Sequence, residues 1–338
     1  MLSDASEIGK ETLLVYLPCH LDFQLALDQA KKIRDIERNQ TDKISLNIKV
    51  MISCNGVEFS EIERQEFTKN CDHANIFPFG ISGDINITQG FMHAIRLAAD
   101  YLWILSSNDA VSEKFIETIS KNLITKTEVN VLVGCPSENL GVRKVHSVFD
   151  QINQDIPFGL ISSVVYRTKE MDRNFDSGVQ MNWTGWGQLA AIEASCIALA
   201  GINVSLVRES DLYHRSIRSL ENQAEEEKRI RNGYAHSFFG MPIVISTLHS
   251  TNRHQKRKYL NGWILSNWYL VNYFYATDFK LWNSHIASNQ NWLKDFSFAS
   301  IKNASLPHRI IFQISKSINI YAFRNIGFAR WLREKLKG

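Results

Sequence analysis

The sequence of 338 residues predicts an α/β fold, in which a mostly parallel sheet is flanked by helices, with a helical C-terminal extension. Two observations indicate this class. Short apolar runs alternate with amphipathic helical runs through the first half of the chain, which is typical of parallel sheets covered on both faces. Beyond residue 215 the alternation stops and helical runs dominate. We therefore expect one domain over residues 1–215 and an extension over residues 216–338.

The first strand and helix signals alternate clearly. Residues 13–17 are apolar throughout and are closed by Pro18, which favours a buried strand. Residues 23–38 carry apolar side chains at helical spacing. Residues 48–53 form a second apolar run, which ends at the turn pair Asn55-Gly56. A short charged helix at 60–69 and a short strand at 74–77 follow.

The later elements are predicted in the same way. They are a helix at 88–100, a strand at 101–105, a helix at 115–124 and a strand at 129–134. Residues 158–166 predict a strand pair or one bulged strand. A strong helix at 188–200 is stopped by Gly201 in the C′ position, and a strand at 202–207 follows it. Helical runs at 216–231, 234–248 and 260–292 complete the extension.

Charge is unevenly distributed along the chain. The total formal charge is +3, but residues 301–338 hold eight Lys or Arg against the single acid Glu334, a net +7. The rest of the chain therefore sums to −4. A basic tail on a mildly acidic body predicts an anionic partner, either a membrane or a nucleic acid. No nucleic-acid-binding motif accompanies the tail, so we expect a membrane rather than a nucleic acid.

Cysteine usage and hydropathy suggest the compartment. The five cysteines are odd in number and form no CxxC pair, which favours reduced thiols over disulfides or a zinc site. The N-terminus lacks the pattern of a signal peptide, and no apolar stretch reaches the roughly 18 to 20 residues that span a bilayer. We expect a cytoplasmic protein, with peripheral attachment to the inner face of the cell membrane left open.

The segment Ser107-Asn108-Asp109 is the strongest candidate for a site. It follows directly on the predicted strand at 101–105, and ligands of α/β sheets bind at the carboxyl ends of strands. A carboxylate there suits Mg²⁺ or Mn²⁺ held against a diphosphate. The alternative is that Asp109 caps a helix beginning near Ser112, since Asp is a favoured N-cap residue.

The order of these features resembles that of the GT-A nucleotide-sugar transferases, which have a Rossmann-like fold. It is closest in kind to the family 2 glycosyltransferases that build bacterial surface polysaccharides such as lipopolysaccharide and capsule. The first strand ends in Pro18-Cys19-His20 and the second in Cys54-Asn55-Gly56, and Asn86 opens the following helix. Ser107-Asn108-Asp109 occupies the position of the family's DxD motif. The resemblance covers residues 13–215.

This resemblance implies transfer of a sugar from a nucleotide-diphosphate sugar, with a UDP-sugar favoured, to a glycan or a lipid-linked oligosaccharide. Three strand ends would converge to bind the donor. The implied donor-binding residues are Pro18, Cys19, His20, Asn55, Asn86, Ser107, Asn108 and Asp109. For Asn55, a simple Asn-Gly turn is an equal alternative.

The resemblance also implies a Mn²⁺ or Mg²⁺ cofactor held by Asp109. Serine and asparagine stand where the family usually has a further acid, so a second ligand must come from elsewhere. His214 follows the predicted strand at 202–207 and is the candidate for that ligand, with an ordinary surface histidine as the alternative. Catalysis without metal, in which Arg or Lys neutralises the leaving group, stays open.

The catalytic base is the least defined part of the site. Inverting members of the family carry an acid at a helix start that here corresponds to residues 182–188, which contain none. Asp176, in the connection upstream, is the candidate base, and Asp172 and Glu193 are weaker alternatives. The missing acid leaves open a relocated base, a retaining mechanism or a loss of activity.

Two aromatic segments suggest further contacts. Trp183 and Trp186 would stack on the rings of an acceptor sugar, or would be core or turn aromatics. Residues 318–336 mix aromatic and basic side chains, which suits an anionic bilayer, or would form a helix docked on the domain.

A second function also fits the sequence. The chain would then be a catalytically inactive GT-A-like subunit that binds a partner enzyme, as the two missing acids suggest.

Overall fold

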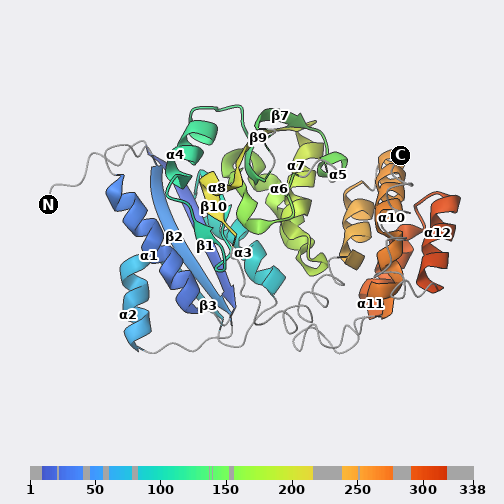
Figure 1. The fold of residues 1–338 in the computed structure, drawn as a ribbon, viewed down its shortest axis with the longest axis horizontal. Coiled ribbons are helices and arrows are strands. Elements are labelled where there is room, and N and C mark those ends of the chain that lie inside the picture. The colour runs from blue at the N-terminus through green and yellow to red at the C-terminus, as the bar shows by residue number, and fades with distance from the viewer. Residues whose placement is uncertain are drawn as a thin grey trace. The chain divides into compact units, whose positions relative to one another are not determined.

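The computed structural model describes residues 10–20, 23–40, 46–55, 61–77, 83–136, 138, 140–151, 156–215, 238–249, 252–276 and 291–317 (Figure 1). The predicted helix at 216–231 and the basic aromatic tail at 318–336 lie outside these residues. The chain divides into two compact units. The first comprises Met1–Asn182 and Gly187–Ile217, and the second comprises Trp183–Trp186 and Arg218–Gly338.

The first unit is built on a sheet of eight strands in the order β3-β2-β1-β4-β8-β6-β9-β7. Their bounds are β1 Glu11–His20, β2 Leu46–Asn55, β3 His73–Phe77, β4 Tyr101–Ile104, β6 Val131–Cys135, β7 Gly141–Val145, β8 Val164–Arg167 and β9 Ile202–Arg208. The β1–β2, β1–β4, β2–β3 and β6–β9 pairs are parallel. Strand β8 is antiparallel to β4 and β6, and β7 is antiparallel to β9. The predicted mostly parallel sheet is confirmed.

Helices cover both faces of this sheet (Figure 1). Their bounds are α1 Phe23–Asn39, α2 Glu61–Asn70, α3 Gly83–Arg96, α4 Phe115–Ile119, α5 Val148–Gln151, α6 Thr168–Gln180, α7 Gly187–Ala198 and α8 Glu209–Leu212. Residues Ser120–Ile124 continue α4 as a π-helical turn, and short 3₁₀ turns span Ile161–Ser163 and Asn182–Thr184. A separate two-stranded ribbon pairs β5 (Ala110–Val111) with β10 (Tyr213–His214).

Strand β1 shows why the sequence forms a buried strand. Alternate residues point to opposite faces. Leu13, Val15 and Leu17 belong to the core that α1 and α4 cover. Tyr16 faces the other way, where α3 approaches so closely that a side chain at Gly90 would meet the Tyr16 ring at 2.9 Å. Because both faces are covered, the strand is apolar throughout.

Helix α6 was not predicted, and it corrects one expectation. The segment around Asp176 was interpreted as part of a connection, whereas Thr168–Gln180 is a continuous helix. Its buried side is formed by Met171, Phe175 and Gly178, at helical spacing. The other residues of α6 are mostly polar, which hid this pattern. The expected strand at 158–166 likewise becomes a 3₁₀ turn followed by the shorter strand β8.

The second unit confirms the helical C-terminal extension. Residues 238–248 are helical, and they are followed by α10 (Arg253–Ala276), α11 (Asn291–Ile301) and α12 (Leu306–Ser317). Ring contacts join these helices, with Phe239–Phe298 centroids 6.0 Å apart, Trp263–Phe312 6.2 Å and Phe298–Phe312 5.5 Å. Trp263, from the predicted aromatic run, is therefore a core residue. No helix in the described residues is long and apolar enough to cross a bilayer.

A buried histidine makes the first unit sensitive to acid. His93 of α3 is 8% exposed, and its ring lies 6.0 Å from that of Tyr16. Burial, together with the nearby Arg96 and His73, lowers the pKa of His93 from 6.5 to about 4. The unfolded chain therefore binds a proton at a pH where the native state does not. The free energy of unfolding should fall as the pH drops from 6.5 towards 4 and should be unaffected above this range.

We expect His93→Gln to reduce the loss of unfolding free energy between pH 7 and pH 5 by about 1–2 kcal/mol. Urea unfolding of both proteins at the two pH values measures this. The same acid-induced loss in the variant and in the parent protein would contradict the assignment.

Candidate donor-binding site

The ends of β1 and β2 and the start of α3 are joined by one buried side chain, that of Asn86. Its Nδ2 donates to the carbonyl oxygens of Cys19 (3.2 Å) and Ser53 (3.0 Å). Its Oδ1 accepts from Ser53 Oγ at 2.5 Å, and the Tyr16 hydroxyl donates to its backbone oxygen at 2.8 Å. Asn86 is only 2% exposed. It therefore holds three elements together rather than facing solvent.

The other predicted donor residues of β1 and β2 lie at the carboxyl edge of the sheet. The register pairs Pro18 with Ser53, Cys19 with Cys54 and His20 with Asn55. The thiols of Cys19 and Cys54 are buried and their sulfur atoms are 3.0 Å apart, so Cys19 presents its backbone to this edge. The hydrogen bond with Cys19 is the main cause that raises the pKa of the Cys54 thiol, and burial is the second. The side chains of His20 and Asn55 lie outside the described part of the chain.

Asp109 lies in the turn that follows β4, and it is oriented by a serine. Ser162 Oγ donates to Asp109 Oδ2 at 2.6 Å and accepts from the backbone N–H of Ser106 at 3.0 Å. The alternative role of Asp109 as a helix cap is wrong, because α4 begins at Phe115 with Lys114 as its N-cap. Ser107 is buried and Asn108 half-buried in the same turn.

The β5–β10 ribbon brings His214 next to this turn. His214 pairs with Ala110, the residue after Asp109, and its side chain is exposed. Burial raises the pKa of Tyr213, and the carboxylates of Glu209 and Asp109 add to the shift, so the Tyr213 ring lies within the field of Asp109. Arg215 follows, with its guanidinium 2.6 Å from Glu209 Oε2. The ribbon thus brings one imidazole near the Asp109 turn, and the cation of Arg215 follows it in the chain.

Metal ligation by protein groups alone is incomplete here. Among the described residues, no group of three or more His, Cys, Asp or Glu side chains could hold a metal ion. Asp109 and His214 would supply two ligands at most. Mg²⁺ sites commonly combine one or two carboxylates with substrate phosphates and water, so a bound diphosphate would have to complete the shell.

The three candidate bases have different surroundings. Asp176 is exposed on α6, and Asp172, on the same helix, is half-buried. Glu193 of α7 is fully buried, where it accepts from Ser147 Oγ at 2.9 Å and from the backbone N–H of Val148 at 2.8 Å. Glu193 therefore caps the start of α5, a structural role for a buried carboxylate.

Trp183 and Trp186 belong to the second unit, although in the sequence they stand between α6 and α7 of the first. Trp183 packs edge-on against Phe296 of α11, with ring centroids 6.2 Å apart. Gly240 approaches the same turn so closely that a Cβ there would lie 2.0 Å from the Thr184 carbonyl oxygen. Both indoles remain half-buried.

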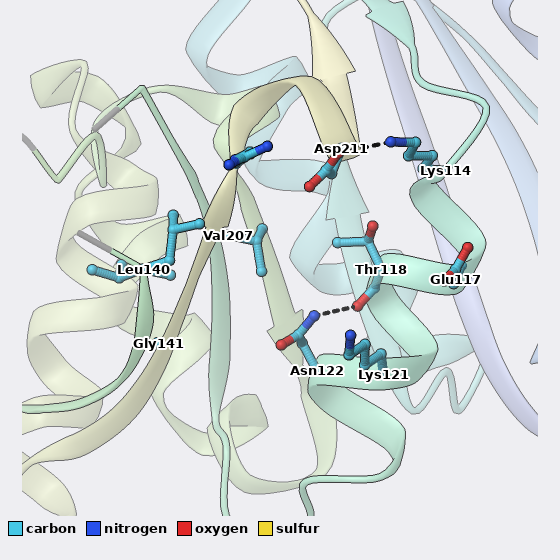
Figure 2. Close-up of a pocket in the computed structure, with 11 residues that line it drawn as sticks. Lys114, Glu117, Thr118, Lys121, Asn122, Leu140, Gly141, Val207 and Asp211 are labelled. Carbon is cyan, nitrogen blue, oxygen red and sulfur yellow. Dashed lines mark hydrogen bonds and ion pairs between the residues drawn. The ribbon is translucent and has the colours of Figure 1, made fainter. Parts of the chain in front are cut away.

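A cavity of about 360 Å³ lies between α4, β7 and the end of β9 (Figure 2). Lys114 reaches across it to Asp211, with a 3.7 Å ion pair, and Asn122 donates to the Thr118 carbonyl oxygen at 2.9 Å. Its lining includes none of the predicted donor-binding residues. It is therefore distinct from the predicted donor site.

No known family profile and no curated protein matches the sequence. Among solved structures, S. aureus TarS matches with a TM-score of 0.55 and 8% identity, over 93% of this chain and 54% of TarS. The chain thus spans about half the length of TarS. This likeness shows the fold, and the predicted GT-A architecture is confirmed.

Weaker similarities extend to two ligand-bound structures. S. aureus TarS 1–349 in complex with UDP has a TM-score of 0.46 and 11% identity, over 90% of each chain. The mannosyltransferase PcManGT from Pyrobaculum calidifontis, in complex with GDP-Man and Mn²⁺, has a TM-score of 0.44 and 9% identity, over 93% of this chain and 86% of that one.

Two residues of the site were missed from the sequence. Ser162 has no local signal, because it meets Asp109 only through the antiparallel pairing of β8 with β4. Arg215 directly follows His214 and could have been noted as the cation that a metal-independent site needs.

The Asn86 network predicts a strong stability effect. We expect Asn86→Ala to lower the free energy of unfolding by about 2–4 kcal/mol, because two carbonyls and one hydroxyl lose buried partners. Chemical denaturation measures this loss. Asn303→Ala, which removes an exposed amide bonded to the Ser300 carbonyl oxygen, is the control and should change stability by less than about 0.5 kcal/mol. Similar losses in both variants would contradict the proposed role of Asn86.

Proposed function

We propose that the chain is a glycosyltransferase that takes a sugar from a nucleotide-diphosphate sugar, with UDP-sugars the first donors to test. The observation that carries this proposal is the carboxylate of Asp109, held by Ser162 beyond the end of β4. Strand β1 runs parallel to β4 and β2 runs parallel to β1, so all three end at the same edge, and the ends of β1 and β2 are joined by Asn86. Nucleotides bind at such edges of α/β sheets.

The chemistry needs charge neutralisation and a base. The acceptor hydroxyl attacks the sugar carbon, the bond from this carbon to the diphosphate breaks, and the hydroxyl proton passes to the base. Asp109, with His214, would hold Mg²⁺ or Mn²⁺ against the diphosphate, where the ion supplies Lewis-acid stabilisation of the leaving group. Arg215 is the cation that would serve in a metal-independent reaction. Asp176 remains the proposed base.

The proposed acceptor is a glycan or a lipid-linked oligosaccharide of bacterial surface polysaccharide synthesis. Trp183 and Trp186 are half-buried, so part of each indole remains available for a sugar ring. Attachment to an anionic membrane through residues 318–336, on the inner face of a cell membrane, is part of this proposal.

A catalytically inactive, partner-binding GT-A subunit is the second candidate. The observation that favours it is the absence of an acid from residues 182–188, together with the serine and asparagine before Asp109. Release of free nucleotide from a donor, measured with and without an acceptor, separates the two functions. A bound donor that is never cleaved would favour the inactive subunit.

Thermal stabilisation tests the donor site. We expect one class among UDP-, GDP-, CMP- and dTDP-sugars, with Mn²⁺, to raise the melting temperature, because a ligand that binds only the native state stabilises it. Asp109→Asn should abolish the shift. Asp211→Asn, a carboxylate two residues from the ribbon that pairs with Lys114, is the matched control and should retain it. No shift with any donor, or an equal loss in both variants, would count against the proposal.

Ser162→Ala tests whether the orientation of Asp109 matters. Without the Ser162 hydroxyl the carboxylate loses a 2.6 Å hydrogen bond, and we expect donor affinity to weaken by about 3- to 10-fold. Ser163→Ala is the control, since Ser163 is also buried but bonds to the carbonyl oxygens of Pro157 and Leu160. Isothermal titration measures both. Equal affinities in the two variants would show that Ser162 does not position Asp109.

A further inference from the structure

Helix α12 exposes an apolar stripe. Leu306, Ile310 and Ile314 are 60%, 49% and 53% exposed, and their spacing of four residues places them on one side of the helix. The opposite side, with Phe312 and Ser315, is buried in the second unit. The stripe is therefore not needed for the core of this unit, and three large aliphatic side chains face solvent together.

The start of α10 exposes cations at a position that disfavours them. Arg253, Lys256, Arg257 and Lys258 all fall within its first six residues, and all but the half-buried Lys256 are exposed. The N-terminal end of a helix carries a partial positive charge, so cations there destabilise the helix. Their presence indicates an anionic partner rather than a contribution to helix stability.

The described residues of the second unit are mostly basic where they are charged. In its described residues, Asp295 is the single acid, against eight Lys or Arg. Helices α10 and α12 contain no acid at all. The described part of this unit therefore carries a net positive charge.

The basic turns and the stripe lie beside each other. Asn261 of α10 accepts a hydrogen bond from the backbone N–H of Ser305 at 3.0 Å, and Leu306 follows Ser305 directly. Arg257 lies one helical turn before Asn261, on the same side of α10. The Trp263–Phe312 ring contact, at 6.2 Å, holds the two helices together. The start of the stripe, at Leu306, therefore lies near the basic first turns of α10.

We propose that this surface of α10 and α12 docks on an anionic lipid bilayer, with Leu306, Ile310 and Ile314 entering the interface and the basic turns contacting lipid phosphates. Amphipathic helices flanked by Lys and Arg bind at the headgroup boundary in this way. A soluble polyanion would leave the aliphatic stripe in water. A second copy would bring two cationic surfaces together. The proposal concerns other residues than the donor site, so neither depends on the other.

Co-sedimentation of the full chain with vesicles tests this. We expect binding to phosphatidylcholine vesicles containing about 30% phosphatidylglycerol, and little binding to phosphatidylcholine alone. The double variant Ile310→Ser/Ile314→Ser should bind at least about tenfold more weakly. The control is Ile197→Ser/Leu199→Ser in the first unit, which changes two aliphatic side chains that are 46% and 44% exposed. It should bind as the parent does. Because the changed residues precede 318, the test is independent of the tail.

Further variants separate the effect of charge on vesicle binding from an effect on folding. Lys256→Gln/Arg257→Gln should weaken binding at low salt and reduce its dependence on salt, whereas Lys121→Gln, an exposed lysine of the first unit, should change neither. Melting temperatures and circular dichroism identify any variant that fails to fold. For such a variant, Ile314→Gln alone replaces the double substitution.

Three outcomes would overturn the proposal. The first is equal binding of the parent protein to anionic and neutral vesicles, or no binding to either. The second is undiminished vesicle binding by a folded stripe variant. The third is that neither the parent protein nor the stripe variant binds vesicles. In that case a loss of self-association by the variant in sedimentation velocity would indicate a second copy as the partner. Equal binding of polyphosphate by both proteins would indicate a soluble polyanion.

Discussion

The carboxamide of Asn86 is the interaction on which the candidate site depends. From the first turn of α3, it satisfies backbone carbonyls at the ends of β1 and β2, so three chain segments meet at a fixed point. Each of these groups is buried, and an unpaired partner would cost free energy at once. These hydrogen bonds therefore fix the ends of β1 and β2 relative to α3.

Two carboxylates of the first unit, Glu193 and Asp109, show how surroundings give one chemical group different roles. Glu193 lies in the core, where its carboxylate oxygens accept hydrogen bonds from Ser147 Oγ and the backbone N–H of Val148. Asp109 lies at the sheet edge, and Ser162, from the 3₁₀ turn that precedes β8, donates to its Oδ2. The first is part of the architecture. The second is placed where α/β folds bind charged ligands.

The sequence predicted the central sheet because its buried strands are long apolar runs, of which β1 is the clearest. It missed β7, whose residues are mostly exposed and include Arg143 and Lys144, so no apolar run marks it. It missed α6 because Met171 and Phe175 are separated by polar residues. The sequence predicted a site at Asp109 but not the contact of Ser162 with Asp109, since only the pairing of β8 with β4 brings Ser162 near. Asn86 was expected to contact donor, and its burial is a tertiary property that local sequence does not carry.

The assignment of the four residues Trp183–Trp186 to the second unit limits how the two units can be separated. They belong to the second unit, yet the chain enters them from α6 and leaves them into α7 of the first. The polypeptide therefore passes between the units three times, and Thr184 is in backbone contact with Gly240. A simple fusion or deletion near residue 217 would leave these four residues without their packing partners. The second unit therefore cannot be separated from the first by a single cut in the chain.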